Sequence, residues 1–245
     1  MQVKEIYAFL NELSPFELQE KWDNSGLLVG NENDEVQKVY ISLDLDEELL
    51  DSVEENSLII THHPLIFSPL RRVNYDSMAT KYLRKLILKN CALICMHTNF
   101  DKTHLNKYVA EKILGLKIED TKEYICYAKV DKSFDEFYKD IAKKLNLKSK
   151  KGVKCHENIE SVALITGSGM SMIAEVEADC FLTGDIKYHD AMEAKARGIS
   201  LIDIGHYESE EHFSTLLLGI CNNYLKKNKI QAIMSNSKNP FVFHI

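Results

Sequence analysis

Two adjacent histidines, His62 and His63, stand where an apolar run meets a proline, in the segment Ile59-Ile60-Thr61-His62-His63-Pro64. An imidazole pair at the end of a buried strand is costly to desolvate unless something binds both rings. Successive side chains of a strand point to opposite faces, and Pro64 restricts His63 to extended conformations, so the two rings can straddle a bridging group. The segment therefore indicates the nucleus of a metal site.

A histidine followed four residues later by a carboxylate occurs twice, each time after a strand-like apolar run. The pairs are His97 with Asp101 and His206 with Glu210. If a helical turn begins at each pair, this spacing places the imidazole and the carboxylate on one face. Together with the adjacent histidines, the sequence offers four imidazoles and two carboxylates at three strand ends.

The combination of imidazole and carboxylate ligands narrows the choice of metal ion. Imidazole with carboxylate suits Zn, Fe, Mn, Co or Ni better than Ca or Mg, and the absence of thiolates argues against a closed structural zinc site. Six groups exceed what one tetrahedral ion uses, so we expect a dinuclear centre with a carboxylate bridging ions ~3.5–4 Å apart. A lone histidine at a strand end is more often a hydrogen-bonded structural residue, but six groups in three matched positions favour the metal site.

Three other polar segments have two interpretations each. Asp23 and Asn24 are typical turn formers, and they can also form a polar wall of the site. The turn of Gly167, Ser168 and Gly169 follows a strand and can hold a phosphate on its backbone N–H groups, although a short glycine turn is often only a turn.

The same ambiguity holds for Asp185 and His189, which repeat the four-residue spacing with the carboxylate first. They can orient a ligand imidazole or contact substrate, while a helix N-cap at Asp185 is the structural alternative. We include both, with the glycine turn, as candidate substrate-binding residues.

Strand and helix patterns alternate along the chain, which predicts an α/β fold. The first half shows a helical pattern at 2–13, strands at 39–43, 57–60 and 92–96, and helices at 47–53, 78–88 and 105–114. The strands are apolar on both faces, which indicates a mainly parallel or mixed sheet flanked by helices. In such folds ligands collect at the carboxyl ends of the strands, where the histidines stand.

The pattern then starts again, which predicts a second α/β lobe. Strand signals lie at 125–130, 162–165, 180–182, 199–204 and 230–234, with helices at 134–147 and 210–225. We place the boundary near Glu123, giving an N-terminal lobe of residues 1–123 and a C-terminal lobe of residues 124–245.

Composition limits the partners and the compartment. The chain has 245 residues, of which 45% are hydrophobic and 27% are charged. Its formal charge of −7 repels polyanions and argues against nucleic-acid binding unless an oligomer forms a channel. A lysine-rich stretch at 143–154 is interpreted as a solvated helix end.

None of the six cysteines forms a Cys-x-x-Cys pair, which fits a reducing compartment. The N-terminus has no signal-peptide pattern and no apolar run approaches ~20 residues, so we expect a cytoplasmic protein without a membrane span.

Several of these motifs together resemble a known family, the GTP cyclohydrolase 1 type 2 homologues, also called NIF-three-like proteins. The motifs appear in the family's order and include Trp22-Asp23-Asn24-Ser25-Gly26-Leu27, Thr61-His62-His63-Pro64-Leu65-Ile66-Phe67, His97-Thr98-Asn99-Phe100-Asp101, Thr183-Gly184-Asp185, and Gly205-His206 with Glu210. The chain lacks the inserted domain of some members, and Pro64 replaces a glycine that others carry.

The resemblance implies a specific ligand set and assembly. Two divalent ions would be held in the cleft between the two lobes, with Glu210 as a bridge and His97 as an additional ligand or a proton-transfer group. Family members assemble as ring-shaped hexamers, so a homo-oligomer is expected. The implied metal ligands are His62, His63, Asp101, His206 and Glu210.

Two functional hypotheses follow. The first is a dinuclear metal-dependent hydrolase that uses metal-activated water on a nucleotide or related small substrate, with a GTP cyclohydrolase-like reaction as one form. The alternative is a non-catalytic metal-binding interaction or chaperone-like protein, whose ions hold the lobes together. The sequence specifies neither the substrate nor the native metal.

Overall fold

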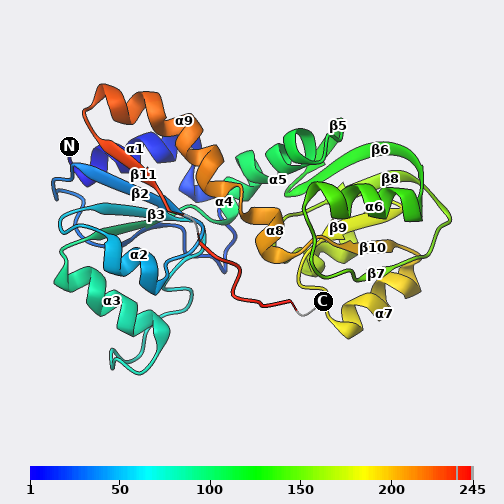
Figure 1. Cartoon of the computed structure of the whole chain (residues 1–245), viewed down its shortest axis with the longest axis horizontal. Coiled ribbons are helices and arrows are strands. Elements are labelled where there is room, and N and C mark those ends of the chain that lie inside the picture. The colour runs from blue at the N-terminus through cyan, green and yellow to red at the C-terminus, as the bar shows by residue number, and fades with distance from the viewer. Residues whose placement is uncertain (236, 244–245) are drawn as a thin grey trace. The chain divides into compact units, whose positions relative to one another are not determined.

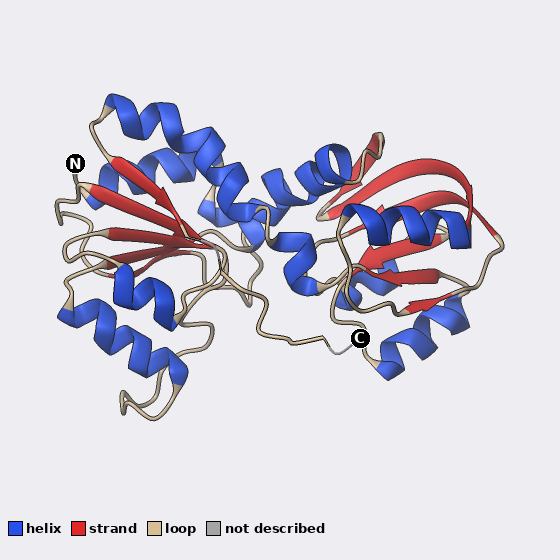
Figure 2. Cartoon of the chain, viewed as in Figure 1, coloured by secondary structure: helices blue, strands red, loops and turns tan. Residues whose placement is uncertain are grey.

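The computed structural model describes residues 1–235 and 237–243. It divides into a first unit, Met1–Phe100 with Phe213–Lys238, and a second unit, Asp101–His212 with Asn239–Ile245. Each unit has one mixed sheet flanked by helices (Figure 2), which confirms the predicted α/β fold class. The division differs from the single boundary expected near Glu123, because the chain returns to the first sheet for its last helix and strand.

The sheet of the first unit has five strands in the order β1-β4-β3-β2-β11. Strands β4, β3, β2 and β11 run parallel, and β1 pairs antiparallel with β4 at one edge. In the register of the central strands, Thr61 lies opposite both Ser42 and Cys95, so the three strands end at the same level. The strands are β1 (Gly26–Val29), β2 (Lys38–Ser42), β3 (Leu58–Thr61), β4 (Ala92–Cys95) and β11 (Gln231–Met234).

Helices cover both faces of this sheet, with α2 and α3 on one side and α1 and α9 on the other (Figure 1). Residues Tyr40, Ile59 and Leu93 of the strands form a buried cluster with apolar side chains of α2 and α3. The helices are α1 (Val3–Leu13), η1 (Phe16–Leu18), α2 (Glu47–Ser52), α3 (Met78–Leu88), α4 (Thr98–Phe100) and α9 (Phe213–Lys227).

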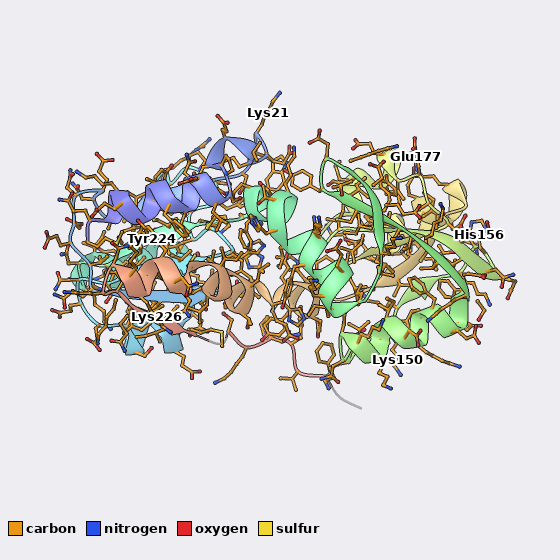
Figure 3. The ribbon with its side chains drawn as sticks, turned by 90° about the horizontal axis from the view of Figure 1, so that it is seen from above. Lys21, Lys150, His156, Glu177, Tyr224 and Lys226 are labelled. Carbon is orange, nitrogen blue, oxygen red and sulfur yellow. The ribbon has the colours of Figure 1, made fainter. Side chains whose placement is uncertain are left out.

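Helices α1 and α9 lie side by side, as seen from above in Figure 3, where Tyr224 of α9 is labelled. The Tyr224 ring stacks on Phe9 of α1 with 3.9 Å between ring centroids, and its hydroxyl donates to the Glu5 carbonyl oxygen at 3.1 Å. This contact joins the N-terminal helix to the helix that returns from the far end of the chain.

The sheet of the second unit has six strands in the order β5-β6-β8-β9-β10-β7. Strands β8, β9 and β10 are parallel, and the pairs β5–β6, β6–β8 and β10–β7 are antiparallel. The strands are β5 (Ile118–Lys122), β6 (Ile125–Ser133), β7 (Gly152–Val153), β8 (Asn158–Leu164), β9 (Cys180–Thr183) and β10 (Ser200–Asp203).

The helical stretch after His97 begins earlier than predicted. We expected a helix at 105–114, whereas helical structure starts at Thr98 and continues as η2 (Asp101–Leu105), α5 (Asn106–Tyr108) and η3 (Val109–Ile113), with π-helical turns in η2 and η3. Thr98 and Asn99 lack an apolar pattern, yet both are buried. The Asn99 side-chain amide donates to the Ser14 carbonyl oxygen at 2.8 Å, which satisfies a polar group in the interior. Asp101, at the start of the first π-helical turn, occupies a position often found at functional sites.

The remaining helices of the second unit are α6 (Phe134–Lys144), η4 (Met170–Glu175), α7 (Tyr188–Arg197) and α8 (His206–Glu210). The helix predicted at 210–225 corresponds to α9, which begins slightly later, at Phe213, and the short helix α8 precedes it. The chain leaves the second unit between these two helices. Among the described residues, no helix is both long and apolar enough to cross a membrane.

Candidate metal centre

Three imidazoles gather at the carboxyl ends of the strands in the first unit. His62 and His63 follow β3, and His97 follows β4. One ring nitrogen from each lies within 4.8 Å of the others, and the ring centroids are 5.1, 5.2 and 5.7 Å apart. Such a group can present several nitrogen ligands to one small region.

His62 is held rigidly. Its side chain is fully buried, and its ring contacts that of Phe213 with 4.9 Å between centroids. Its Nδ1 lies 2.8 Å from the carbonyl oxygen of Met96. Because a carbonyl oxygen can only accept a hydrogen bond, Nδ1 carries the proton and the lone pair of the neutral ring is on Nε2. His62 is therefore in the tautomer that coordinates a metal through Nε2.

His63 is oriented by a carboxylate. Its Nδ1 donates to Asp44 Oδ1 at 2.7 Å, while the Thr61 hydroxyl donates to its carbonyl oxygen at 3.0 Å. Asp44 lies just after β2, and its backbone N–H donates to the Ser237 hydroxyl at 2.9 Å. Asp44 was not predicted as a site residue from the sequence, although a carboxylate shortly after a strand end is a signal that indicates such a role.

His97 is oriented by Asp23, whose Oδ1 lies 2.8 Å from His97 Nδ1. The Asp23 side chain is fully buried and also accepts from the Asn24 N–H, the Ser25 hydroxyl and the N–H and hydroxyl of Thr98. Burial raises the pKa of Asp23, but the hydrogen bonds from His97 and Thr98 outweigh it and hold the pKa well below its ordinary value. Asp23 is thus an anion that fixes His97, which agrees with the polar-wall interpretation.

In the second unit, His206 and Glu210 lie one turn apart on α8, as the four-residue spacing predicted. His206 Nε2 is 3.1 Å from Glu210 Oε2, and His206 Nδ1 is 2.7 Å from Asp185 Oδ2. If Nδ1 donates to Asp185, the neutral ring has an acceptor at Nε2 facing a carboxylate oxygen. Two acceptors at this distance need a proton or a cation between them.

Asp101 adds a second carboxylate to this cluster. Oxygen atoms of Asp101 and Glu210 lie within 4.8 Å of each other, and the two residues are 8% and 3% exposed. Two buried carboxylates this close repel each other unless positive charge is supplied. Carboxylate and imidazole ligands suit a divalent ion of the Zn, Fe or Mn type, so the residues present fit a metal.

The glycine turn after β8 leaves room for the Glu210 carboxylate. Gly167 has a φ of +62°, and a Cβ atom there would lie 2.0 Å from Glu210 Oε1. Its N–H donates to the Ser209 hydroxyl at 3.0 Å, and the Gly169 N–H donates to the Thr183 hydroxyl at 2.8 Å. These two N–H groups are used within the protein, so they do not form the phosphate cradle that we considered. Ser168 is exposed, and substrate contact there stays a prediction.

Asp185 and His189 have different surroundings. Asp185 holds His206, and it is not an N-cap, because α7 is capped at Lys187. His189 is exposed beside the ring of Tyr188, with 5.3 Å between centroids, and it belongs to none of the metal-capable groups found among the described residues. Substrate binding by these two residues stays a prediction.

One feature is common to all four imidazoles. Each Nδ1 is held by an oxygen acceptor: the Met96 carbonyl, Asp44, Asp23 or Asp185. Metal-ligating histidines usually show this arrangement, because the bond at one nitrogen fixes the tautomer and the aim of the other. All four rings were predicted from the sequence. Of the three carboxylates that hold them, only Asp185 was predicted to orient a ligand imidazole.

Comparison with known proteins identifies the family. A family model described as Duf34/NIF3 (NGG1p interacting factor 3) matches residues 1–240. The chain belongs to the Duf34/NIF3 family. The resemblance seen in the sequence is thereby confirmed.

Relatives of this Duf34/NIF3 chain align over almost its whole length. The GTP cyclohydrolase 1 type 2 homolog of Campylobacter jejuni is 46% identical over 244 residues, covering 99% of this chain and 100% of the relative. The GTP cyclohydrolase 1 type 2 of Helicobacter pylori is 43% identical over 242 residues, covering 97% of each chain. A hypothetical protein of Staphylococcus aureus, solved by crystallography, has a TM-score of 0.87 at 29% identity and covers 100% of this chain and 99% of its own.

Proposed function

We propose that this Duf34/NIF3 chain is a dinuclear, divalent-metal-dependent hydrolase that acts on a nucleotide or related small substrate. In this proposal ligands from both units act on the same two ions, and His97 is a further ligand or a proton-transfer group. The proposed metal ligands are His62, His63, Asp101, His206 and Glu210.

The shared hold on Nδ1 of the four histidines is the observation that carries the proposal. A structural histidine is satisfied by hydrogen bonds at both nitrogens to whatever acceptor or donor is near. Here four rings from three strand ends all use Nδ1 for an oxygen acceptor, which leaves Nε2 as the coordinating atom in each. The buried carboxylates of Asp101 and Glu210 add the negative charge that divalent ions require.

Divalent ions bound by such ligands supply Lewis acidity and lower the pKa of water, which supports hydrolysis near neutral pH. The chain's own residues provide the positioning. Asp23, Asp44 and Asp185 fix the orientation of three of the imidazoles. Because Nδ1 of His97 is bonded to Asp23, Nε2 is the atom through which this ring would bind an ion or move a proton.

The names of two relatives suggest the first substrate to test. The Helicobacter pylori relative is named GTP cyclohydrolase 1 type 2, and the Campylobacter jejuni relative is named a homolog of that enzyme. Hydrolytic ring opening of GTP is therefore the first reaction to follow, with other nucleotides and phosphodiesters beside it. The fold alone does not select among these reactions.

The test combines metal loading with one isosteric substitution. The protein is stripped with a chelator and reloaded separately with Zn, Fe, Mn, Co or Ni, and products from GTP are followed by chromatography. We expect turnover with at least one metal and its loss in Glu210→Gln, because the amide keeps the shape but removes the ligand charge. Glu208→Gln is the matched control, since Glu208 is on the same helix α8 but accepts from the Asn239 amide at 3.0 Å.

Absence of any turnover that depends on both metal and Glu210 would reject the hydrolase. If stripping the metal then lowered the melting temperature strongly, and Glu210→Gln did the same, the non-catalytic metal-binding interaction or chaperone-like protein would be the better description. Metal content measured on every preparation separates a failure to load metal from a failure of catalysis.

A further inference from the structure

Two large aromatic side chains are exposed beside the imidazoles of the first unit. Trp22, the only tryptophan of the chain, is 56% exposed, and Phe67 is 50% exposed. Their ring centroids are 5.8 Å apart, with the planes tilted by 42°. We refer to Trp22 and Phe67 as the aromatic pair.

The aromatic pair is anchored to both loops that carry histidines. The Asn24 side-chain amide donates to the Ile66 carbonyl oxygen at 2.5 Å, which ties the turn containing Trp22 to the loop after His63. Asp23, next to Trp22, is the carboxylate that holds His97. These bonds fix the position of the pair without covering its rings, so the apolar surface is preorganised and open.

The pair lies directly beside the candidate metal ligands. The Trp22 ring meets the His97 ring edge-on, with 6.2 Å between centroids. A planar ligand stacked on the indole would therefore have its other parts within reach of the imidazole cluster. Arg71 and Arg72 follow Phe67 in the same loop and are exposed, so the loop also supplies positive charge suited to phosphate groups.

We propose that the aromatic pair binds the heteroaromatic base of the substrate, a purine nucleotide, by stacking on Trp22 with Phe67 supporting the edge. The proposal rests on the proposed function, because it assigns a substrate-binding role at the same site. An indole offers the largest π surface among side chains, and aromatic stacking on a nucleobase changes affinity by about 5- to 100-fold. The same loop also exposes Val73 and Tyr75, but the Arg84 guanidinium lies over the Tyr75 ring, 4.6 Å from its centroid.

The single tryptophan makes a direct binding measurement possible. Metal-loaded protein is titrated with GTP while tryptophan emission is followed, with excitation at the red edge where the base does not absorb. Inorganic tripolyphosphate serves as the probe that has the phosphates without the base. We expect GTP to quench Trp22, and tripolyphosphate to bind, as measured by calorimetry, without comparable quenching.

Two substitutions then separate the base from the phosphates. Phe67→Ala keeps the fluorescent reporter and should weaken GTP binding about 5-fold or more, while Trp22→Leu, followed by calorimetry, should weaken it at least as much. Neither should change the affinity for tripolyphosphate. Tyr75→Ala is the matched control, because Tyr75 is an exposed aromatic residue of the same loop whose ring packs against Arg84, and it should leave both affinities unchanged.

Three outcomes would overturn the proposal. The first is equal GTP affinity in wild type, Phe67→Ala and Trp22→Leu, and the second is equal quenching by tripolyphosphate. The third is emission that changes with protein concentration in the absence of nucleotide, which would show that a second copy of the chain covers the pair.

Failure here is distinguishable from failure of the proposed function. Base-dependent quenching without any turnover would leave the base site in place and reject the hydrolase. Unchanged GTP turnover, with unchanged KM, in Trp22→Leu would reject the base site and leave the hydrolase in place.

Discussion

The orientation of a metal-binding histidine depends on the group that accepts a hydrogen bond from its second nitrogen. In this chain these acceptor groups differ in how deeply they are buried. Asp23 is fully buried with several donors around it, whereas the side chain of Asp44 is 41% exposed. Spacing in the sequence identified the six candidate ligands, because periodicity and strand ends leave a visible pattern. It gave no sign that the Met96 carbonyl or Asp44 would hold an imidazole, since those contacts join residues far apart in the chain.

Removing such an acceptor group should weaken metal binding without unfolding the protein. Asp44→Ala deletes the acceptor of His63 Nδ1 from a partly exposed position, so the ring loses its fixed tautomer and aim. We expect metal affinity to fall about 10- to 100-fold. Calorimetric titration with metal measures this, and thermal unfolding of the metal-free protein should be nearly unchanged.

Glu48→Ala is the control for this prediction, because Glu48 is an exposed carboxylate in the same stretch that pairs with Lys238. Equal metal affinity in wild type and Asp44→Ala would show that Asp44 does not position a ligand.

At the scale of elements, the strand ends and glycine turns bring the ligands together. The parallel strands of the first unit end at one level. His62 therefore bonds to the Met96 carbonyl oxygen, 34 positions later in the sequence, and its ring lies beside that of His97. The sequence predicted these strands well because they are continuously apolar. It missed β5 and β7, since β5 is mostly exposed and β7 has only two residues.

Helix boundaries near the site were predicted less well, for a physical reason. Thr98 and Asn99 begin the helical stretch with buried polar side chains that hydrogen-bond to Asp23 and Ser14. A hydrophobic pattern cannot show such partners. The helix predicted from residue 210 begins instead at Phe213, after α8 has ended at Glu210.

Gly167 provides a test at this scale. In Gly167→Ala, the new Cβ would collide with Glu210 Oε1, and the left-handed backbone would add strain of about 1–2 kcal/mol. We expect Glu210 to be displaced and metal affinity to fall about 10-fold or more. Metal titration and chemical unfolding, run on the same variant, measure the two effects separately.

Gly219→Ala is the matched control, because Gly219 lies within α9 and a Cβ there would meet nothing within 4 Å. That variant should keep its metal affinity and gain slight helix stability. If Gly167→Ala bound metal as tightly as Gly219→Ala, the open space at Gly167 would have no role in placing Glu210.

For the whole molecule, the sequence predicted two α/β sheets but not the path of the chain between them. The return of α9 and β11 to the first sheet is a long-range pairing, in which Gln231 lies opposite Lys38, and no local signal encodes it. The ring-shaped hexamer stays a prediction, for which light scattering should give six chains of 28.1 kDa. The two-ion centre stays a prediction as well, and each unit supplies part of its proposed ligand set.

The number of ions bound per chain decides whether the centre is dinuclear. Metal-stripped protein is reloaded, freed of excess metal and measured by elemental analysis against protein concentration, for wild type, His63→Gln in the first unit and Glu210→Gln in the second. We expect two ions per wild-type chain and loss of metal in both variants, with Glu208→Gln retaining two. One ion or none in wild type, or full retention in either ligand variant, would contradict a dinuclear centre built from both units.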